Sequence, residues 1–317
     1  MFTNDCKKCP NCDSNHVIKK AIRNGIRRYK CNDCDKWFSS KRRPEKLTKN
    51  IFQEYIYKRQ TLKDLSFKYK RSISWVQNKI KEFEPDEKVH NPRAVNLICD
   101  ATFYGKRRDK LGTLVFIDSL THEILIWKHI ETEKAIDYKQ LLLQLLSLGY
   151  TISAVTVDGK KGLYKVFQDY PIQMCHFHQK RTTRRYLTNK PKVEASKDLK
   201  KIASKLKYSD EVRFKKALDI WYLKYKSFID KKTTNRDTGK EFFTHQRTRS
   251  AYRSLVSNLS YLFTHKNNKK LSINNTTNLI EGGVFSPLKI LIKIHRGLSK
   301  SLKLKLVDEY LVNYKKK

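Results

Sequence analysis

The chain has 317 residues, of which 69 are Lys or Arg and 31 are Asp or Glu, so its formal net charge is +38. Its 17 Tyr and 15 Phe exclude a purely disordered basic tail, and no apolar run reaches the roughly 18 residues of a membrane span. A charge excess spread along the whole chain predicts a polyanion partner. The N-terminus lacks the basic and apolar regions of a signal peptide. We therefore expect a cytoplasmic protein, without a membrane partner, whose clustered cysteines bind metal.

Five of the seven cysteines lie within the first 34 residues. Cys9-Pro10-Asn11-Cys12 and Cys31-Asn32-Asp33-Cys34 have the spacing of a zinc ribbon, and Asn24-Gly25 between them predicts the turn of a β-hairpin. Cys6-Lys7-Lys8-Cys9 is a competing C-x-x-C motif, but a proline between the ligands suits the tight turn better. The sequence predicts a zinc ribbon over residues 1–43, with one structural Zn²⁺ ion. The expected ligands are Cys9, Cys12, Cys31 and Cys34.

Residues 44–94 predict a helix-turn-helix followed by a linker. Ile51 and Ile56 recur at helical spacing, and Ser72 can cap a second helix that runs to Ile80. Leu62, Leu65, Val76 and Ile80 would form the shared core. The polar residues expected on the outer face, which suit phosphates and base edges, are Ser74, Gln77, Asn78 and Lys79. The alternative is a plain three-helix subdomain, which we rank second because the zinc ribbon and the charge favour DNA binding.

Two apolar runs end in acids. Asn96-Leu97-Ile98-Cys99 is followed by Asp100, and residues 152–157 are followed by Asp158. Strands that stop at a carboxylate place it at the rim of a sheet, where open α/β folds build their sites. Further strands are expected at residues 113–117, 123–127 and 172–176, with an amphipathic helix over residues 135–148. Three antiparallel strands, a helix, a strand, a helix and a strand match the order of the ribonuclease H-like fold, which brings Asp100 and Asp158 together.

Two ionised carboxylates at one rim repel each other unless they share a proton or bind a cation. Because a phosphate-bearing partner is expected, a pair of Mg²⁺ ions (or Mn²⁺) is the favoured interpretation. Asp118 also follows an apolar run. Its flank, Ser119-Leu120-Thr121-His122, predicts a hairpin turn in which Asp is common for conformational reasons, so Asp118 is excluded from the site.

A third acid, Glu281, is expected on a helix that Thr277 caps and that restarts at Pro287 after Gly282-Gly283. The region of about 181–276 before it predicts a helical insert, with a loop at residues 233–239. Its aromatic side chains are interpreted as core rather than as platforms for bases; they are Trp221, Tyr222 and Tyr225.

Four sequence blocks together resemble the Mutator-like bacterial insertion-sequence transposases. They are Asp100-Ala101-Thr102-Phe103, Val157-Asp158-Gly159, Cys175-His176-Phe177-His178 and Thr277-Asn278-Leu279-Ile280-Glu281-Gly282. The resemblance implies a ribonuclease H-like catalytic domain over residues 95–317 with a DDE triad, which would be Asp100, Asp158 and Glu281. The family's C-x2-H element maps onto Cys175 and His178, and we expect a supporting role for them, without zinc, because no second Cys–His pair lies nearby in the sequence. The resemblance also places a basic pair, His295 and Arg296, within reach of bound DNA.

The sequence thus predicts an α/β DDE transposase that cleaves and transfers strands of double-stranded DNA, at element ends and at a target. The resemblance implies a bacterial, nucleoid-associated protein that acts at least as a homodimer on paired ends. Two alternatives remain. One is a DNA-binding regulator that has lost catalysis, although a complete acid triad argues against it; the other is a nuclease or resolvase of the same fold, which would cleave without joining.

Overall fold

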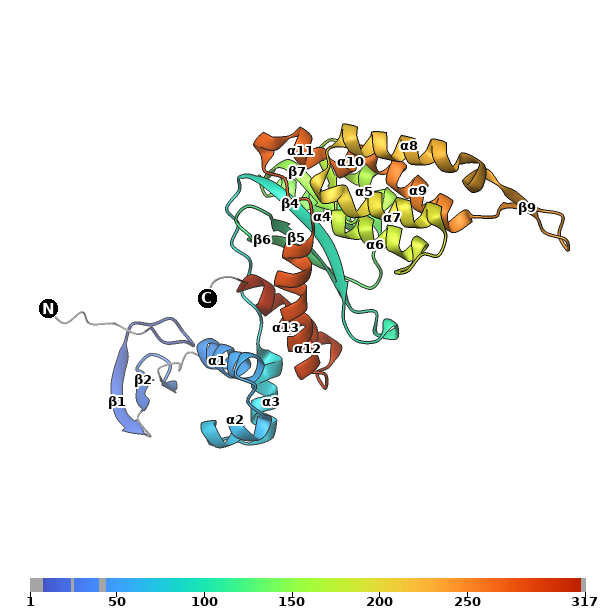
Figure 1. Ribbon diagram of the computed structural model, residues 1–317. Coiled ribbons are helices and arrows are strands. Elements are labelled where there is room, and N and C mark those ends of the chain that lie inside the picture. Colours follow the sequence, from blue (N-terminus) through green and yellow to red (C-terminus); the bar gives the residue numbers. More distant parts are fainter. Residues whose placement is uncertain (1–7, 24–25, 40–43, 315–317) are drawn as a thin grey trace. The chain divides into compact units, whose positions relative to one another are not determined.

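The computed structural model describes residues 8–23, 26–39 and 44–314. The chain divides into two compact units, Met1–Glu84 and Pro85–Lys317 (Figure 1). Three features expected from the sequence lie outside the described residues: Cys6, the Asn24-Gly25 turn and the end of the basic tail at residues 315–317. In the described part of the chain, no helix combines the length and apolar character that crossing a membrane requires.

The first unit begins with a small antiparallel sheet. Its strands are β1 (Val17–Arg23), β2 (Ile26–Cys31) and β3 (Trp37–Ser39), in that order. The pairing of β1 with β2 agrees with the expected hairpin, and β3 adds a strand that the sequence did not predict. Because so small a sheet buries little apolar surface, its stability is expected to depend on its cysteines.

Three helices follow in this unit: α1 (Pro44–Tyr57), α2 (Leu62–Tyr69) and α3 (Ile73–Glu82). The side chain of Thr61 caps α2, and Ser72 caps α3 by accepting a hydrogen bond from the Trp75 amide. As predicted, Leu65, Val76 and Ile80 are buried, whereas Leu62 is only half-buried. The rest of the buried apolar set in this region is Ile51, Phe52, Ile56 and Phe83.

A five-stranded mixed sheet organises the second unit, with the strand order β6-β5-β4-β7-β8. The antiparallel strands are β4 (Ala94–Phe103), β5 (Gly112–Asp118) and β6 (Ile124–Ile130); β7 (Thr151–Val157) runs parallel to β4, and β8 (Ile172–Met174) runs parallel to β7. Helices α4 (Ala135–Ser147) and α5 (Lys161–Val166) make the connections to β7 and β8. This order, with the first and fourth strands adjacent, is compatible with the ribonuclease H-like fold expected from the sequence.

Two strand ends differ from the prediction. Asp100 lies inside β4, since β4 stays paired with β5 as far as Phe103 while its pairing with β7 stops at Ile98. Strand β8 is shorter than expected because Cys175 already precedes the first turn of the next helix. The amide of Cys175 still donates to the carbonyl of Val157, so this segment remains joined to the sheet.

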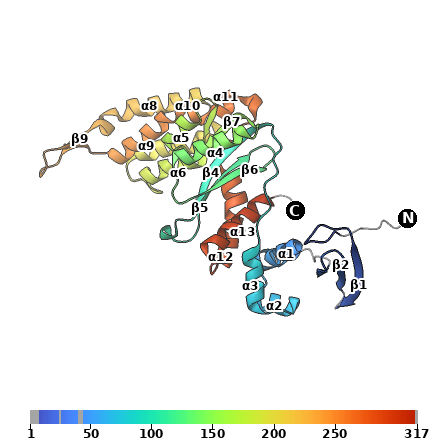
Figure 2. The same cartoon turned by 180° about the vertical axis from the view of Figure 1, so that it is seen from behind.

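Helices that pack side by side form the insert (Figures 1 and 2). They are α6 (His176–Leu187), α7 (Glu194–Ser204), α8 (Glu211–Asp230), α9 (Gln246–Ser257), α10 (Leu259–Leu262) and α11 (Thr264–Asn267). Trp221 is buried, and its indole donates to the Ala195 carbonyl, which agrees with a core role. Most of the predicted loop at residues 233–239 connects the two strands of a hairpin, β9 (Lys232–Thr234) and β10 (Glu241–Phe243), that projects from the end of the insert (Figure 1).

The chain ends in a π-helical segment, Leu279–Phe285, followed by α12 (Ser286–Ile294) and α13 (Lys300–Val312). Pro287 lies in the first turn of α12, as predicted. Thr277 stands directly before the first helical residue, Asn278, as expected; its carbonyl accepts from the amides of Ile280 and Glu281, and its hydroxyl donates to the Glu281 carboxylate. Single-turn 3₁₀ helices occupy Arg107–Asp109, Lys205–Tyr208 and Lys269–Leu271.

Candidate active site

Adjacent parallel strands bring the first two predicted acids to the same edge of the sheet. Ile98 of β4 pairs with Thr156 of β7, and Asp100 and Asp158 each stand two residues further along. Both side chains line one cavity of about 1400 Å³, and Glu281 of the π-helical segment lines it as well. The structure therefore places the three predicted acids around a common space.

The cavity disfavours the ionised forms of the acids that line it. Burial, together with the nearby carboxylates of Glu281 and Asp158, raises the pKa of Asp100 to about 7. Burial also raises the pKa of Asp158, and the charge of Glu133 adds to that effect. Carboxylates whose ionised forms are disfavoured in this way are suited to binding cations, which supply the missing positive charge.

Glu281 is held by its neighbours on α6 and before the π-helical segment. The hydroxyl of Thr277 donates to the Glu281 carboxylate, and the Thr277 amide donates to the sulfur of Cys175 at 3.3 Å. The Nδ1 atom of His178 lies 3.7 Å from the Oε1 atom of Glu281. π-Helical turns occur often at functional sites, and here the turn presents Glu281 to this polar cluster.

Cys175, His178 and Glu281 form a group whose ligand atoms all lie within 4.8 Å of one another. We expected a supporting role for the first two residues, and the structure places them beside the third predicted acid. Among the described residues, the three acids themselves do not form so tight a group. The tighter group of possible ligand atoms is therefore the one that Glu281 forms with Cys175 and His178.

Several residues of the cavity were missed by sequence reasoning. Glu133 lines it as a fourth acid and accepts a hydrogen bond from Tyr138 at 2.7 Å. Its only sequence signal is an acid in the connection before α4. The same cavity is lined by six basic residues, which are Lys160, Arg181, Arg184, Arg185, Arg253 and Lys289. In the sequence, the signal of this wall is the two basic pairs at the start of the insert, Lys180-Arg181 and Arg184-Arg185.

Two other predictions about individual residues have different outcomes. His295 is buried, with 7% of its surface exposed, so it does not form an exposed pair with Arg296, which alone faces solvent. Asp118 is buried and accepts hydrogen bonds from Thr121 and from Arg93. Its conformational role in the turn after β5, expected from the sequence, agrees with these contacts.

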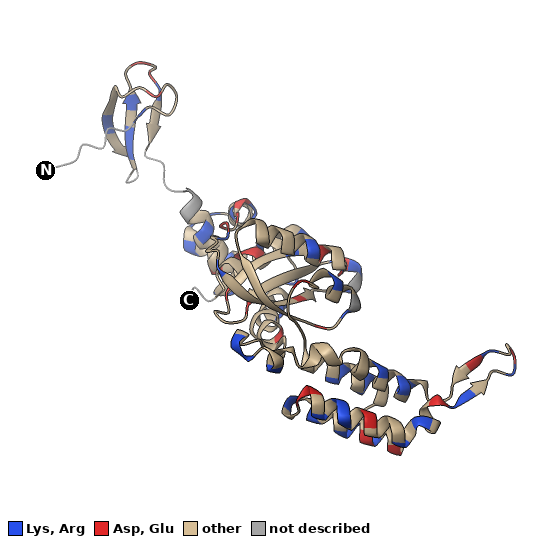
Figure 3. Cartoon of the chain, turned by 90° about the horizontal axis from the view of Figure 1, so that it is seen from above, with Lys and Arg blue, Asp and Glu red and all other residues tan. Residues whose placement is uncertain are grey.

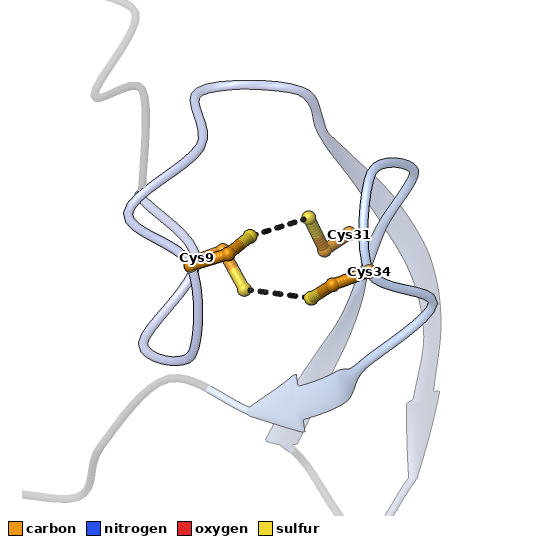
Figure 4. A group of neighbouring side chains, drawn as sticks. Cys9, Cys31 and Cys34 are labelled. Atoms are coloured by element: carbon orange, nitrogen blue, oxygen red, sulfur yellow. Dashed lines mark hydrogen bonds between the residues drawn. The ribbon is translucent and has the colours of Figure 1, made fainter.

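In the first unit, the four predicted zinc ligands converge. The sulfur atoms of Cys9 and Cys34 are 3.6 Å apart, as are those of Cys12 and Cys31 (Figure 4). All four lie within 4.8 Å of one another, and the Asn11 amide points at the Cys9 sulfur from 3.4 Å. Four thiols at these distances could bind one Zn²⁺ ion in tetrahedral geometry.

The outer face of α3 is polar, as expected. Ser74, Gln77 and Asn78 are exposed, whereas Lys79 is half-buried and forms an ion pair with Glu82 of the same helix. Lys and Arg are distributed over both units rather than confined to α3 (Figure 3). The charge of the chain therefore supports contact with a polyanion over a wide area, not at this helix alone.

No protein-family model matches the sequence, and no curated protein resembles it closely enough to count as a relative. Among solved structures, the chain is similar to the Drosophila P element transposase strand transfer complex. The TM-score is 0.42 and the sequence identity is 9%, over 87% of this chain and 93% of that chain.

Proposed function

We propose that the chain is a DDE transposase of the kind that its sequence blocks resemble, the Mutator-like bacterial insertion-sequence enzymes. The observation that carries this proposal is the shared cavity of Asp100, Asp158 and Glu281, which basic side chains also line. Acids alone would suit many metal sites. Acids that face a wall of arginines suit a metal-dependent reaction on a phosphodiester.

The donor set fits a pair of hard cations. Asp100 and Asp158, whose pKa values are raised, and Glu281 would hold two Mg²⁺ or Mn²⁺ ions. When bound, such ions polarise the scissile phosphate and favour deprotonation of the attacking oxygen. Thr277 holds the Glu281 carboxylate in place, and the basic wall binds the phosphates on either side of the reacting one.

The reaction consists of two in-line displacements at phosphorus. Water attacks the phosphodiester at the element end, the bond to the 3′ oxygen breaks, and a 3′-hydroxyl and a 5′-phosphate are released. That 3′-hydroxyl then attacks a phosphodiester of target DNA, and the broken target strand leaves with its own 3′-hydroxyl. No covalent bond to the protein forms, and no oxidant or nucleotide cofactor is needed.

In the same proposal the first unit recognises the element ends. Its four cysteines would hold one structural Zn²⁺ ion, and the exposed face of α3 would contact the major groove. Two ends must meet before strand transfer, so at least two chains are expected to assemble on DNA. A bacterial protein with this task would act in the cytoplasm, at the nucleoid.

A strand-transfer assay with end-containing DNA and Mg²⁺ tests the proposal. The wild type should cleave and join, and the substitutions Asp100→Asn, Asp158→Asn and Glu281→Gln should each abolish both steps while DNA binding persists. Glu131→Gln, at an exposed acid outside the cavity, is the matched control and should keep full activity. Cleavage without joining would favour a nuclease or resolvase, and binding without either step would favour a regulator.

A further inference from the structure

The four arginines of the basic wall belong to two helices of the insert, α6 and α9. On α6, His178, Arg181, Arg185 and Thr188 follow one another at intervals of three or four residues, so they share one face of the helix and its C-terminal end. On α9, Ser250, Arg253, Ser254 and Ser257 also share one face. Both faces line the cavity that contains the acids, and the α6 face begins beside Glu281.

These two helices are joined firmly at the wall. The buried Gln179 side chain of α6 bonds to Ser254 and Asn258, at the C-terminal end of α9. The guanidinium of Arg247 donates to the last carbonyls of α6, those of Arg185 and Tyr186, at 2.9 and 3.0 Å. The wall is therefore a preformed surface rather than a set of loose side chains.

The arginines of the wall differ from others in the insert. Arg213 and Arg249 form ion pairs with Asp210 and Asp230. In the described part of the chain, by contrast, no acid forms an ion pair with the wall arginines, which are Arg181, Arg184, Arg185 and Arg253. Like charges three and four residues apart destabilise a helix. Arginines that lie close together without ion pairs to acids are suited to binding consecutive phosphates of another molecule.

The size of the cavity limits what can enter it. Its volume of about 1400 Å³ gives room for a segment of one DNA strand. Its lining offers cations and hydroxyls with few aromatic side chains, chiefly Tyr186 and Phe285. Such a lining follows the backbone of a strand without reading its bases.

We propose that the faces of α6 and α9 form a track that binds the phosphates of one single DNA strand as it leaves the acids. This inference rests on the proposed function, because it takes the reacting phosphodiester to lie at Asp100, Asp158 and Glu281. From His178 to Arg185 the helix rises about 10 Å, which is long enough to contact more than one phosphate of a strand. The helical insert would then hold the substrate strand in addition to packing on the sheet.

The test is a binding titration with the full chain and no added Mg²⁺, with Zn²⁺ retained. Three DNAs are compared: a blunt duplex, the same duplex with a single-stranded 3′ tail of about five nucleotides, and the same duplex lengthened by about five base pairs. The wild type should gain affinity from the tail and not from the extra base pairs. The triple variant Arg181→Gln, Arg184→Gln, Arg185→Gln should lose that gain.

The salt dependence of binding measures the number of contacts between the protein and the phosphates. Each lost contact to a single strand should reduce the slope of log affinity against log salt by about 0.7, so the triple variant should show a slope smaller by roughly 2. Arg213→Gln, at an exposed arginine of α8 outside the cavity, is the control and should match the wild type. Photocrosslinking from iodouracil in the tail should label residues 178–189 of the wild type, a result that does not depend on a variant's folding.

Unchanged tail preference and slope in a triple variant that melts like the wild type would overturn the track, as would an equal gain from the extra base pairs. The assay of strand transfer separates this outcome from failure of the proposed function. Tail binding that depends on the arginines, in a chain that never cleaves, would leave the track standing and remove the transposase activity. Cleavage that depends on the acids, without any effect of the arginine substitutions, would overturn the track and leave the transposase activity standing.

Discussion

His178 places its Nδ1 atom 3.7 Å from the Oε1 atom of Glu281, so a cation and an acid of the site face each other directly. Burial alone would lower the pKa of His178, but its hydrogen bond with Cys175 and the charges of Cys175, Glu281 and Asp100 raise that pKa to about 9. At neutral pH the imidazole is therefore protonated. It offsets part of the negative charge that divalent cations would otherwise neutralise.

This pairing predicts a competition between His178 and metal. The protonated imidazole of His178 stabilises the folded chain. This contribution is complete at a pH below the pKa of His178 in the unfolded chain, about 6.5, and is lost as the pH rises through its pKa in the folded chain, about 9. At pH 7.5 the variant His178→Gln lacks that cation, so Mg²⁺ should bind its carboxylates more tightly. A larger rise in melting temperature with added Mg²⁺ is expected in this variant than in the wild type. Asp100→Asn, as control, should lose most of the rise; equal rises in His178→Gln and the wild type would contradict the competition.

Thr277 is predicted to act on the reaction through Glu281. Thr277→Val keeps the shape of the side chain but removes the hydroxyl that donates to the Glu281 carboxylate. A hydrogen bond to a charged group contributes about 1.5–3 kcal/mol, so the cleavage rate should fall about 10- to 100-fold. Thr277→Ser should restore most of it.

The apparent affinity for Mn²⁺ separates this positioning role from a purely structural one. It should weaken in Thr277→Val and recover in Thr277→Ser, whereas a purely structural role would change the melting temperature without changing the affinity of the folded protein for Mn²⁺. Wild-type cleavage by Thr277→Val would show that the contact is not needed.

The strand order and the meeting of Asp100 and Asp158 could be predicted because apolar runs that end in a carboxylate constrain a sheet strongly, whereas the place of Glu281 beside them was implied only by the resemblance of its sequence block. Asp158 follows its strand as expected, whereas the position of Asp100 inside β4 was not predictable, since it depends on how far β5 continues to pair. The alternation of apolar and polar residues in a strand, and its composition, do not indicate where the partner strand ends.

Contacts between segments that lie far apart along the chain also could not be predicted from the sequence. Nothing near Cys175 signals Thr277, about 100 residues later, as its hydrogen-bond partner. Likewise, Arg181 and Arg185 look like an ordinary solvated helix face until α9 and the sheet edge are placed around them. The burial of His295 depends on tertiary packing, which the spacing of the C-terminal block does not contain.

Asp118 provides a test of stability rather than of catalysis. Burial would raise its pKa, but hydrogen bonds from Thr121 and the Leu120 amide, together with the Arg93 guanidinium, hold the pKa below its usual value. Its contribution to stability is therefore complete above its unfolded pKa of about 3.9 and is lost as the pH falls through the lower folded value. Asp118→Asn should lower the free energy of unfolding by about 1.5–3 kcal/mol at pH 7, because it removes a charged hydrogen-bond partner of Arg93 and leaves Glu123 as the other carboxylate that pairs with it.

Urea unfolding at a series of pH values checks this prediction. The difference between the wild type and Asp118→Asn should shrink as the solution is acidified below pH 4. The control is Asp219→Asn, at an exposed ion pair with Lys215, which should cost about 0.5 kcal/mol or less. A pH-independent difference for Asp118→Asn would mean that packing, not charge, holds this turn.

The cysteine cluster predicts one Zn²⁺ ion per chain. Cys31→Ser should abolish zinc binding because it removes one of four converging thiols. Cys6→Ser should keep the metal, and its loss there would shift the ligand set to include Cys6. Chelation should unfold the residues up to about 40 and leave the second unit folded, which proteolysis followed by mass spectrometry can measure. Simultaneous unfolding of both units would contradict an independent zinc ribbon.

The outer face of α3 predicts how specificity and general affinity are divided. Gln77→Ala or Asn78→Ala should reduce discrimination between element-end and random DNA by about 1–3 kcal/mol, if each exposed amide bonds to a base in bidentate fashion. Lys79 is predicted to contact a phosphate. It forms an ion pair with Glu82, so Glu82→Gln should release Lys79 for this contact and strengthen binding to both DNAs alike. The salt slope should then steepen by about 0.9 for one added phosphate contact. Lys79→Ala should weaken both DNAs equally, because a phosphate contact carries no sequence information. Competition titrations with the full chain measure these effects, and an equal loss for end and random DNA in Gln77→Ala would move end recognition away from α3 to the helical insert.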